Sequence, residues 1–176
     1  MIKQVSVAIS LILLTLTMFA GVAKDSKLNG LVRMYYTDGN IKLKARFREG
    51  KRNGLTTMYY ENGAVKTKAQ YKDGKLNGLT TAYYENGSVQ QVDTYKDDKR
   101  NGLTTTYYED GNIKAKGQYK DGKANGLATA YYENGSVQEA GIFKDNKLNG
   151  LFTTYYGNGN IIANLNEFYS NSMQLL

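Results

Sequence analysis

Apolar and polar positions along this chain recur in one pattern with a period of 24 residues. The clearest copy is residues 51–74, KRNGLTTMYYENGAVKTKAQYKDG. Within it, 55–61 and 65–71 are rich in Thr, Tyr and β-branched residues and lack helical spacing of apolar positions, which predicts two strands. Copies extend from Lys27 to about Tyr169. We therefore predict an all-β repeat protein: six stacked hairpins in an elongated, twisted, single-layer sheet of about twelve strands.

The Asn-Gly pair in the middle of each copy predicts a two-residue hairpin turn, because both residues tolerate positive φ. At Asn62 and Gly63 this turn places Tyr60 opposite Val65 and divides the side chains between two faces. The more apolar set is assigned to a packed face: Thr56, Met58, Tyr60, Val65, Thr67, Ala69 and Tyr71. The outward face then holds Leu55, Thr57, Tyr59, Lys66, Lys68 and Gln70. A three-residue turn would exchange the faces of the second strand.

One hairpin is marginally stable in water, so we expect stability to come from the interfaces between repeats. The predicted structural core repeats the same positions along the array: Tyr60, Val65, Tyr71, Tyr84, Val89, Tyr95, Tyr108, Ile113, Tyr119, Tyr132, Val137 and Phe143. The sequence departs from the repeat after Ile161. We expect the repeat domain to occupy 24–170 and residues 171–176 to form a C-terminal cap or tail.

The first 23 residues differ from the repeat. A positive start at Lys3 precedes an apolar run over 5–19, and small residues precede a potential cleavage site between Ala23 and Lys24. These are the parts of a secretory signal peptide, although an uncleaved membrane anchor is the alternative. We therefore predict an exported protein, periplasmic, in the outer envelope or secreted. It is not a lipoprotein, because the chain has no cysteine.

The composition argues against catalysis. The chain contains no histidine and no cysteine, which removes the commonest general base, the usual zinc ligands and thiol nucleophiles. Its acidic residues recur at turns, where they are expected to be structural. We predict no enzymatic activity, no metal site and no cofactor.

Tyrosine is the strongest chemical feature, with 16 tyrosines and no tryptophan. Each Tyr-Tyr pair is expected to place one ring on each face of the sheet, so that the outward rings form a ladder beside Lys-x-Lys segments. Tyrosine offers a large contact area at low entropy cost. The candidate binding residues are Tyr59, Lys66, Lys68, Tyr83, Tyr107, Lys114, Lys116 and Tyr131. Alternatively, this ladder only shields the second face of a single-layer sheet.

The unit Asn-Gly-Leu-x-x-x-Tyr-Tyr-Glu-Asn-Gly-x-Val, which closes with Tyr-Lys-Asp-Gly-Lys, resembles the bacterial variant of the MORN repeat. That variant occurs in YwqK-type antitoxin proteins and in many exported bacterial proteins. The resemblance covers nearly all of the chain beyond residue 23. It implies hairpin stacks that act in protein association or at membrane surfaces.

Three functions remain open from the sequence. The first is a non-enzymatic scaffold that binds another protein through the Tyr/Lys face. The second, implied by the resemblance, is an antitoxin or immunity protein that binds a toxin. The third is a module that binds anionic lipid or glycan at the envelope, in keeping with a net charge of +7. Nucleic acid is not an expected partner of an exported chain.

Overall fold

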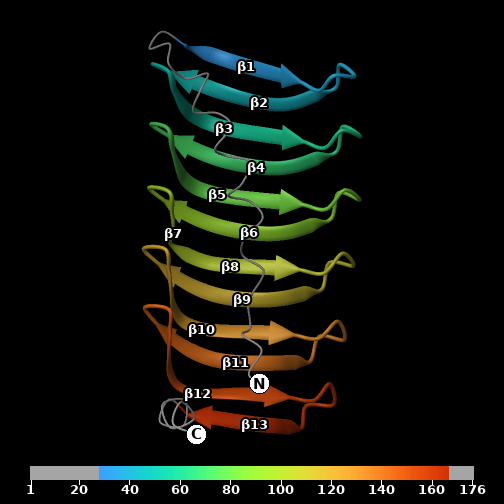
Figure 1. Cartoon of the computed structure of the whole chain (residues 1–176), viewed down its shortest axis with the longest axis vertical. Coiled ribbons are helices and arrows are strands. Elements are labelled where there is room, and N and C mark those ends of the chain that lie inside the picture. Colours follow the sequence, from blue (N-terminus) through green and yellow to red (C-terminus); the bar gives the residue numbers. More distant parts are fainter. Residues whose placement is uncertain (1–27, 167–176) are drawn as a thin grey trace, which may run out of the picture.

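The computed structural model describes residues 28–166, which form one antiparallel sheet. The hairpins stack in chain order (Figure 1). These residues contain no helix, and the prediction of an all-β chain of hairpin repeats is confirmed. The strands are β1 (Gly30–Tyr35), β2 (Ile41–Arg48), β3 (Lys51–Tyr59), β4 (Val65–Lys72), β5 (Lys75–Tyr83), β6 (Val89–Lys96), β7 (Lys99–Arg100), β8 (Gly102–Tyr107), β9 (Ile113–Lys120), β10 (Lys123–Tyr131), β11 (Val137–Lys144), β12 (Lys147–Tyr155) and β13 (Ile161–Asn166).

The hairpin loops at Asn-Gly are longer than the sequence predicts. The Tyr60 N–H donates to the Ala64 carbonyl (2.8 Å), and the Gly63 N–H donates to the Tyr60 carbonyl (3.0 Å). Three residues therefore lie between Tyr60 and Ala64, and of these only Gly63 has a positive φ, 83°. Asn62 keeps an ordinary φ because its side-chain Oδ1 accepts the Ala64 N–H (2.9 Å), a local bond that favours this loop.

A shift in strand pairing next to this loop restores the predicted register. Tyr59 pairs with Val65, whereas Met58 pairs with Thr67, so β4 contains one extra residue at this point. Such a bulge returns the following side chains to the faces that a two-residue turn would give them. Thr56 accordingly pairs with Ala69, as predicted. The predicted pairing of Tyr60 with Val65 is wrong, because loop and bulge together move Val65 opposite Tyr59.

The two-residue turns lie at the other end of each hairpin, at Asp-Gly. Asp73 and Gly74 both have positive φ, 51° and 88°, between the paired residues Lys72 and Lys75. These are the dihedral signs of a type I′ turn, whose twist matches that of the flanking strands. Asn-Gly and Asp-Gly therefore have separate roles in this repeat.

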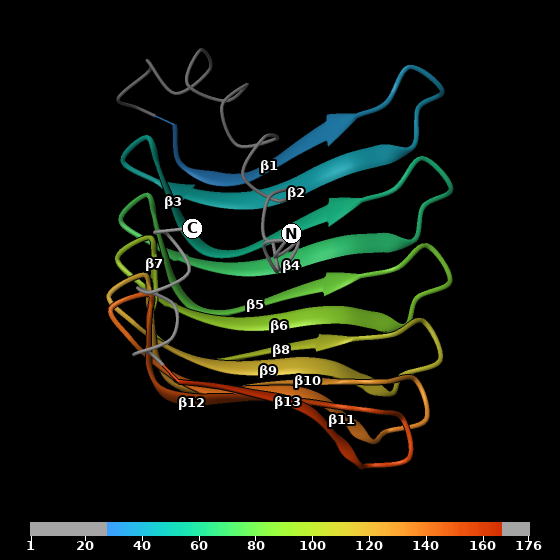
Figure 2. The ribbon, with the colours of Figure 1, turned by 60° about the horizontal axis from the view of Figure 1, so that its bottom comes forward.

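A bend near the tight turns makes the sheet curved. Ala69 pairs with Thr80, but Tyr71 pairs with Leu76, so β5 contains two extra residues there. Gly78 lies in this bulge with a φ of 115°. The strand ends consequently curve to one side, as Figure 2 shows. An even shift leaves the face of each following side chain unchanged.

The bend identifies the concave face. Phe143 and Leu148 are paired at the bent end of β11 and β12. A Cβ placed on Gly141 would lie 3.3 Å from a Leu148 methyl and 3.6 Å from the Phe143 ring. The bent end therefore folds over the face that contains Gly141. We call this face, with Ala69 and its equivalents, the concave face and the opposite one the convex face.

The core lies mainly on the concave face and consists mostly of small side chains, whereas Thr57, Thr105 and Thr153 are buried on the convex face. Its buried residues include Leu43, Ala45, Ala69, Tyr71 and Ala82. Thr56 and Thr80 are buried there too. Small residues dominate because the curved sheet brings the side chains of neighbouring strands together on its inner side.

The last described strand, β13, lies within the bounds 24–170 expected for the repeat domain. Residues 161–166 form β13 and pair with β12, as the second strand of the sixth hairpin. The predicted cap at 171–176 lies outside the described residues. The predicted signal peptide, including the site between Ala23 and Lys24, also lies outside them.

Candidate binding surfaces

One leucine of each repeat is exposed. Its side chain lies on the convex face. In β3, for example, Leu55 is next to Thr56, whose side chain lies on the concave face, and successive side chains of a strand point to opposite faces. Between 42% and 57% of each of these residues is accessible. We call the set the leucine ladder: Leu31, Leu55, Leu79, Leu103, Leu127 and Leu151. Leu55 lies on the outward face predicted for it. The ladder itself was not predicted, although a leucine follows every Asn-Gly pair at the repeat junctions.

The first tyrosine of each Tyr-Tyr pair lies on the same face as the leucine ladder. Leu55, Thr57 and Tyr59 are alternate residues of β3, so their side chains point the same way. The candidate binding residues Tyr59, Tyr83, Tyr107 and Tyr131 occupy this position and are half-buried. The convex face therefore combines leucine and tyrosine rows that run across the strands.

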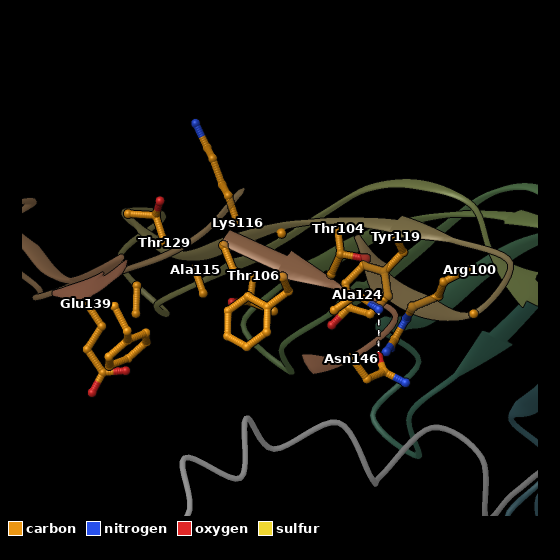
Figure 3. Close-up of a pocket in the computed structure, with 16 residues that line it drawn as sticks. Arg100, Thr104, Thr106, Ala115, Lys116, Tyr119, Ala124, Thr129, Glu139 and Asn146 are labelled. Atoms are coloured by element: carbon orange, nitrogen blue, oxygen red, sulfur yellow. Dashed lines mark hydrogen bonds between the residues drawn. The ribbon is translucent and has the colours of Figure 1, made fainter. Parts of the chain in front are cut away.

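The lysines of each Lys-x-Lys segment have different neighbours. Lys68 pairs with Thr57 on the convex face, and its Nζ lies 5.7 Å from the centroid of the Tyr83 ring. Figure 3 shows Lys116, the equivalent residue, pointing to the side opposite Glu139 and Asn146.

The other lysine of each segment lies near a loop. The Nζ of Lys66 is 5.1 Å from the Tyr60 ring centroid, and that of Lys114 is 5.4 Å from the Tyr108 ring centroid. Each lysine therefore contacts a different row of tyrosines. Lys68 belongs to the convex face, whereas Lys66 and Lys114 are associated with the loop tyrosines.

The second tyrosine of each pair forms a bond between repeats. The Tyr60 hydroxyl donates to the carbonyl of Tyr83 in the next repeat (2.7 Å). Equivalent bonds of 2.7–2.8 Å are donated by Tyr36, Tyr84, Tyr108 and Tyr132. We call these five residues the clamp tyrosines. Tyr60, Tyr84, Tyr108 and Tyr132 were predicted to be core. All five clamp tyrosines are half-buried at the loop ends of the hairpins.

The remaining predicted core residues divide into two groups. Val65, Val89, Ile113 and Val137 are half-buried and pair with the first tyrosine of each pair. This pairing places them opposite a convex-face tyrosine, because of the extra residue beside the loop. Tyr71, Tyr95, Tyr119 and Phe143 occupy the bent end. Of these, Tyr71 is buried and the others are half-buried.

A buried ion pair lies in the middle of the array and was missed by the sequence analysis. Asp93 is 1% exposed and occupies the position of Ala69 and Gly117 in neighbouring repeats. Its Oδ1 lies 2.9 Å from the Nε of Arg100. Thr104 and Gln91 each donate a side-chain hydrogen bond of 2.7 Å to its carboxylate. The only sequence signal is one acidic residue at a small-residue position.

The environment of this pair fixes the charge of Arg100. Burial alone would lower the pKa of its guanidinium, but the negative charge of Asp93 and the neighbouring Tyr95 and Tyr119 more than offset this, so the pKa is raised. The Arg100 guanidinium also lies 5.5 Å from the Tyr119 ring centroid. Its charge is thus compensated within the sheet.

Within 28–166, no group of three or more acidic side chains is placed to hold a metal ion. The same residues include no helix long and apolar enough to cross a membrane. The described residues form a sheet with two extended faces and a hollow on its concave face.

The repeat matches a known protein family. The family model described as MORN repeat variant matches residues 28–49, 52–73, 76–97, 100–121, 124–145 and 148–166. No curated protein matches the sequence. Solved structures that are similar include a mutant of S. aureus TarM in complex with Fondaparinux, alpha-GlcNAc-glycerol and UDP, at 10% identity and a TM-score of 0.38, over 69% of this chain and 21% of that one. A second TarM structure gives 11% identity and a TM-score of 0.36, over 68% and 22%. The chain thus spans about a fifth of TarM.

Proposed function

The chain belongs to the MORN repeat variant family, and from that premise we propose that it is a non-enzymatic scaffold that binds another protein through its convex face. The observation on which the proposal rests is the leucine ladder, an apolar row repeated along the array. Exposed apolar side chains that recur along one face of a sheet are typical of an interaction surface. The absence of histidine and cysteine from the sequence supports a non-enzymatic role.

Tyrosine and lysine on the same face suit a protein partner. Half-buried tyrosines such as Tyr59 and Tyr83 are already restricted in motion, so contact with them costs little further entropy. Lys68 adds positive charge beside these rings. An acidic partner would be attracted by this charge, with an association rate that falls as salt increases. If that partner is a toxin, the protein is an immunity protein.

A surface of anionic lipid or glycan is the second candidate. Leucine side chains next to tyrosine and lysine are also typical of proteins that lie at the interface of a charged membrane. We further propose that the protein is exported, on the basis of residues 1–23, and that it meets either partner at the cell envelope. The intact mass of the protein from the envelope should then correspond to a chain that begins near Lys24.

The test replaces three leucines of the ladder, with Leu55→Ser, Leu79→Ser and Leu103→Ser combined. The matched control replaces neighbouring polar residues of the same face, Gln70→Ser and Gln118→Ser, which pair with two of these leucines. We expect the leucine variant to retain its β circular dichroism spectrum and to lose at least about tenfold in affinity for the partner that the unmodified array captures from envelope extract. The control should bind normally.

Two outcomes would contradict the proposal. One is unchanged partner binding by the triple variant. The other is binding to vesicles of anionic phospholipid with no protein captured, which would favour the membrane candidate. A variant with four lysines replaced by Gln should bind an acidic partner more weakly and with less dependence on salt. The four residues are Lys66, Lys68, Lys114 and Lys116.

A further inference from the structure

The concave face contains a hollow over β8 to β12, on the opposite side of the sheet from the leucine ladder (Figure 3). Its volume is about 630 Å³, and its lining is mainly apolar. Side chains from the bent strand ends, among them Ala124 and Asn146, border it on one side. A hollow of this size is within the range of small-molecule sites in proteins, roughly 300–1,000 Å³.

Small residues of two adjacent repeats form the floor of the hollow. Ala115, Gly117, Ala128 and Ala130 line it on β9 and β10. Elsewhere in the array larger side chains fill equivalent positions: Leu43 is equivalent to Ala115, and Met58 to Ala130. The rings of Tyr119, Phe143 and Phe152 form the walls. The space therefore results in part from small residues at positions where Leu43 and Met58 stand in other repeats.

The hollow has one uncompensated charge. Arg100 lies at one end, but Asp93 neutralises it. The Lys116 side chain points to the other face (Figure 3). Glu139 lines the hollow, and its strand neighbours on either side are Ala130 and Thr154. Among the described residues, no ion pair or hydrogen bond involves the Glu139 carboxylate. The position thus offers an acceptor for a cation beside an apolar surface.

We infer that this hollow binds a small organic cation, an apolar body that bears one protonated amine. Glu139 would accept the ammonium hydrogens in a charge-assisted bond. The apolar body would cover the alanine floor between the aromatic walls, where a cation close to a ring face is also favoured. A volume several times that of a single side chain suits a free molecule rather than one residue of a protein partner.

The test measures binding of three matched probes to the full chain by calorimetry: tryptamine, its alcohol analogue indole-3-ethanol and its acid analogue indole-3-propionate. We expect tryptamine to bind at least about tenfold more tightly than the acid, with the alcohol between them. Glu139→Gln should remove the preference for the amine. Glutamine is tolerated at this position of the repeat, because Gln91 occupies the equivalent site.

Variants that fill the hollow provide the second arm. Ala115→Leu and Ala130→Met introduce side chains that the same positions hold in other repeats, so they are expected to fold. Each should abolish binding of all three probes, and in the unmodified protein the methyl resonances of Ala115, Ala128 and Ala130 should shift on addition of tryptamine.

Several results would overturn the inference. They are equal or tighter binding of the acid, an amine preference that persists in Glu139→Gln, unchanged binding in the filled variants, and no binding of any probe. Circular dichroism checks the fold of each variant, and Glu139→Gln tests the site even if a filled variant is unstable. Because the hollow and the leucine ladder lie on opposite faces, failure of one proposal leaves the other intact.

Discussion

The two ends of each hairpin join neighbouring repeats in different ways. At the loop end the link is a side chain, the hydroxyl of a clamp tyrosine such as Tyr60. At the tight-turn end it is the backbone: the N–H of Gly74 donates to the Arg52 carbonyl (2.8 Å), and Gly122 does the same to Arg100. A side-chain link requires one residue type, whereas a backbone link requires only a conformation.

The sequence reflects this difference. Tyrosine occupies every clamp position from Tyr36 to Tyr132. The second residue of the tight turn varies. Asp98 and Asn146 stand there in place of glycine, and their φ angles are 67° and 69°. Their side chains accept backbone N–H groups of the preceding tight turn, from Leu76 and Ala124 (2.7 Å each). A hydrogen bond between neighbouring repeats thus offsets the strain of a left-handed conformation.

The largest expected effect is at the loop end. Tyr60→Ala removes both a ring and a link between repeats and should lower the free energy of unfolding by about 3 kcal/mol. Tyr59→Ala removes only a ring on the convex face and should cost much less. Urea denaturation of the two variants measures the difference. A larger loss in Tyr59→Ala would show that the convex face, and not the clamp, stabilises the array.

At the tight turn, Gly74→Ala should lower the free energy of unfolding by about 1–2 kcal/mol, because alanine is strained at a φ of 88°. Gly74→Asn should cost less, since Asn146 has the same place in another repeat and forms a compensating bond. The same denaturation experiment compares the two. Equal losses would mean that the Asn side chain does not offset the strain.

Tyr60→Phe separates the hydrogen bond from the ring. The carbonyl of Tyr83 would lose its donor, and we expect a loss of about 1 kcal/mol in the free energy of unfolding. The Tyr59→Phe variant is the control, because within residues 28–166 its hydroxyl forms no hydrogen bond between repeats. A loss as large as that of Tyr60→Ala would assign the whole effect to the hydroxyl.

The smallest expected effect is a loss of folding stability at alkaline pH. Burial, together with the Glu85 carboxylate, raises the pKa of Tyr60 above its usual value of 10.0. Burial and nearby acidic groups likewise raise the pKa of Tyr36 and Tyr108. The folded state therefore favours the protonated phenols. Their contribution to folding stability is complete below pH 10.0 and is lost as the pH rises through the folded-state pKa.

Denaturation curves collected from pH 8 to 11 should therefore show falling stability at the upper end. Replacing these three clamp tyrosines by Phe should reduce the fall, although Tyr71 and Tyr95, whose pKa is also raised by burial, will leave part of it. An unchanged alkaline profile in the triple variant would show that the clamps do not contribute to it.

The sequence predicts the fold because the hairpin pattern is local. The alternation around Thr56 and Ala69 places both on the packed face, and the structure agrees. The prediction of a two-residue turn at Asn62 was wrong. A two-residue turn and a longer loop with a bulge give the same register beyond Thr67. Sequence alternation cannot distinguish them.

The surfaces were less predictable. The bend depends on Gly78 and its equivalents, whose bulges are not visible in strand periodicity. Without the bend, the hollow beside Ala115 and Glu139 could not be foreseen, since its walls come from strands in three repeats. The ion pair of Asp93 and Arg100 likewise requires knowledge of pairing across the sheet.

The clamp tyrosines give the array a direction. Each repeat between the first and the last donates one hydroxyl to the following repeat and accepts one from the preceding repeat. In the sixth repeat, Tyr156 is 55% exposed, and no described residue accepts a hydrogen bond from its hydroxyl. In the first, no described tyrosine donates to the Tyr35 carbonyl. Every clamp bond therefore runs in the same direction along the described repeats, so the two ends of this array are chemically different.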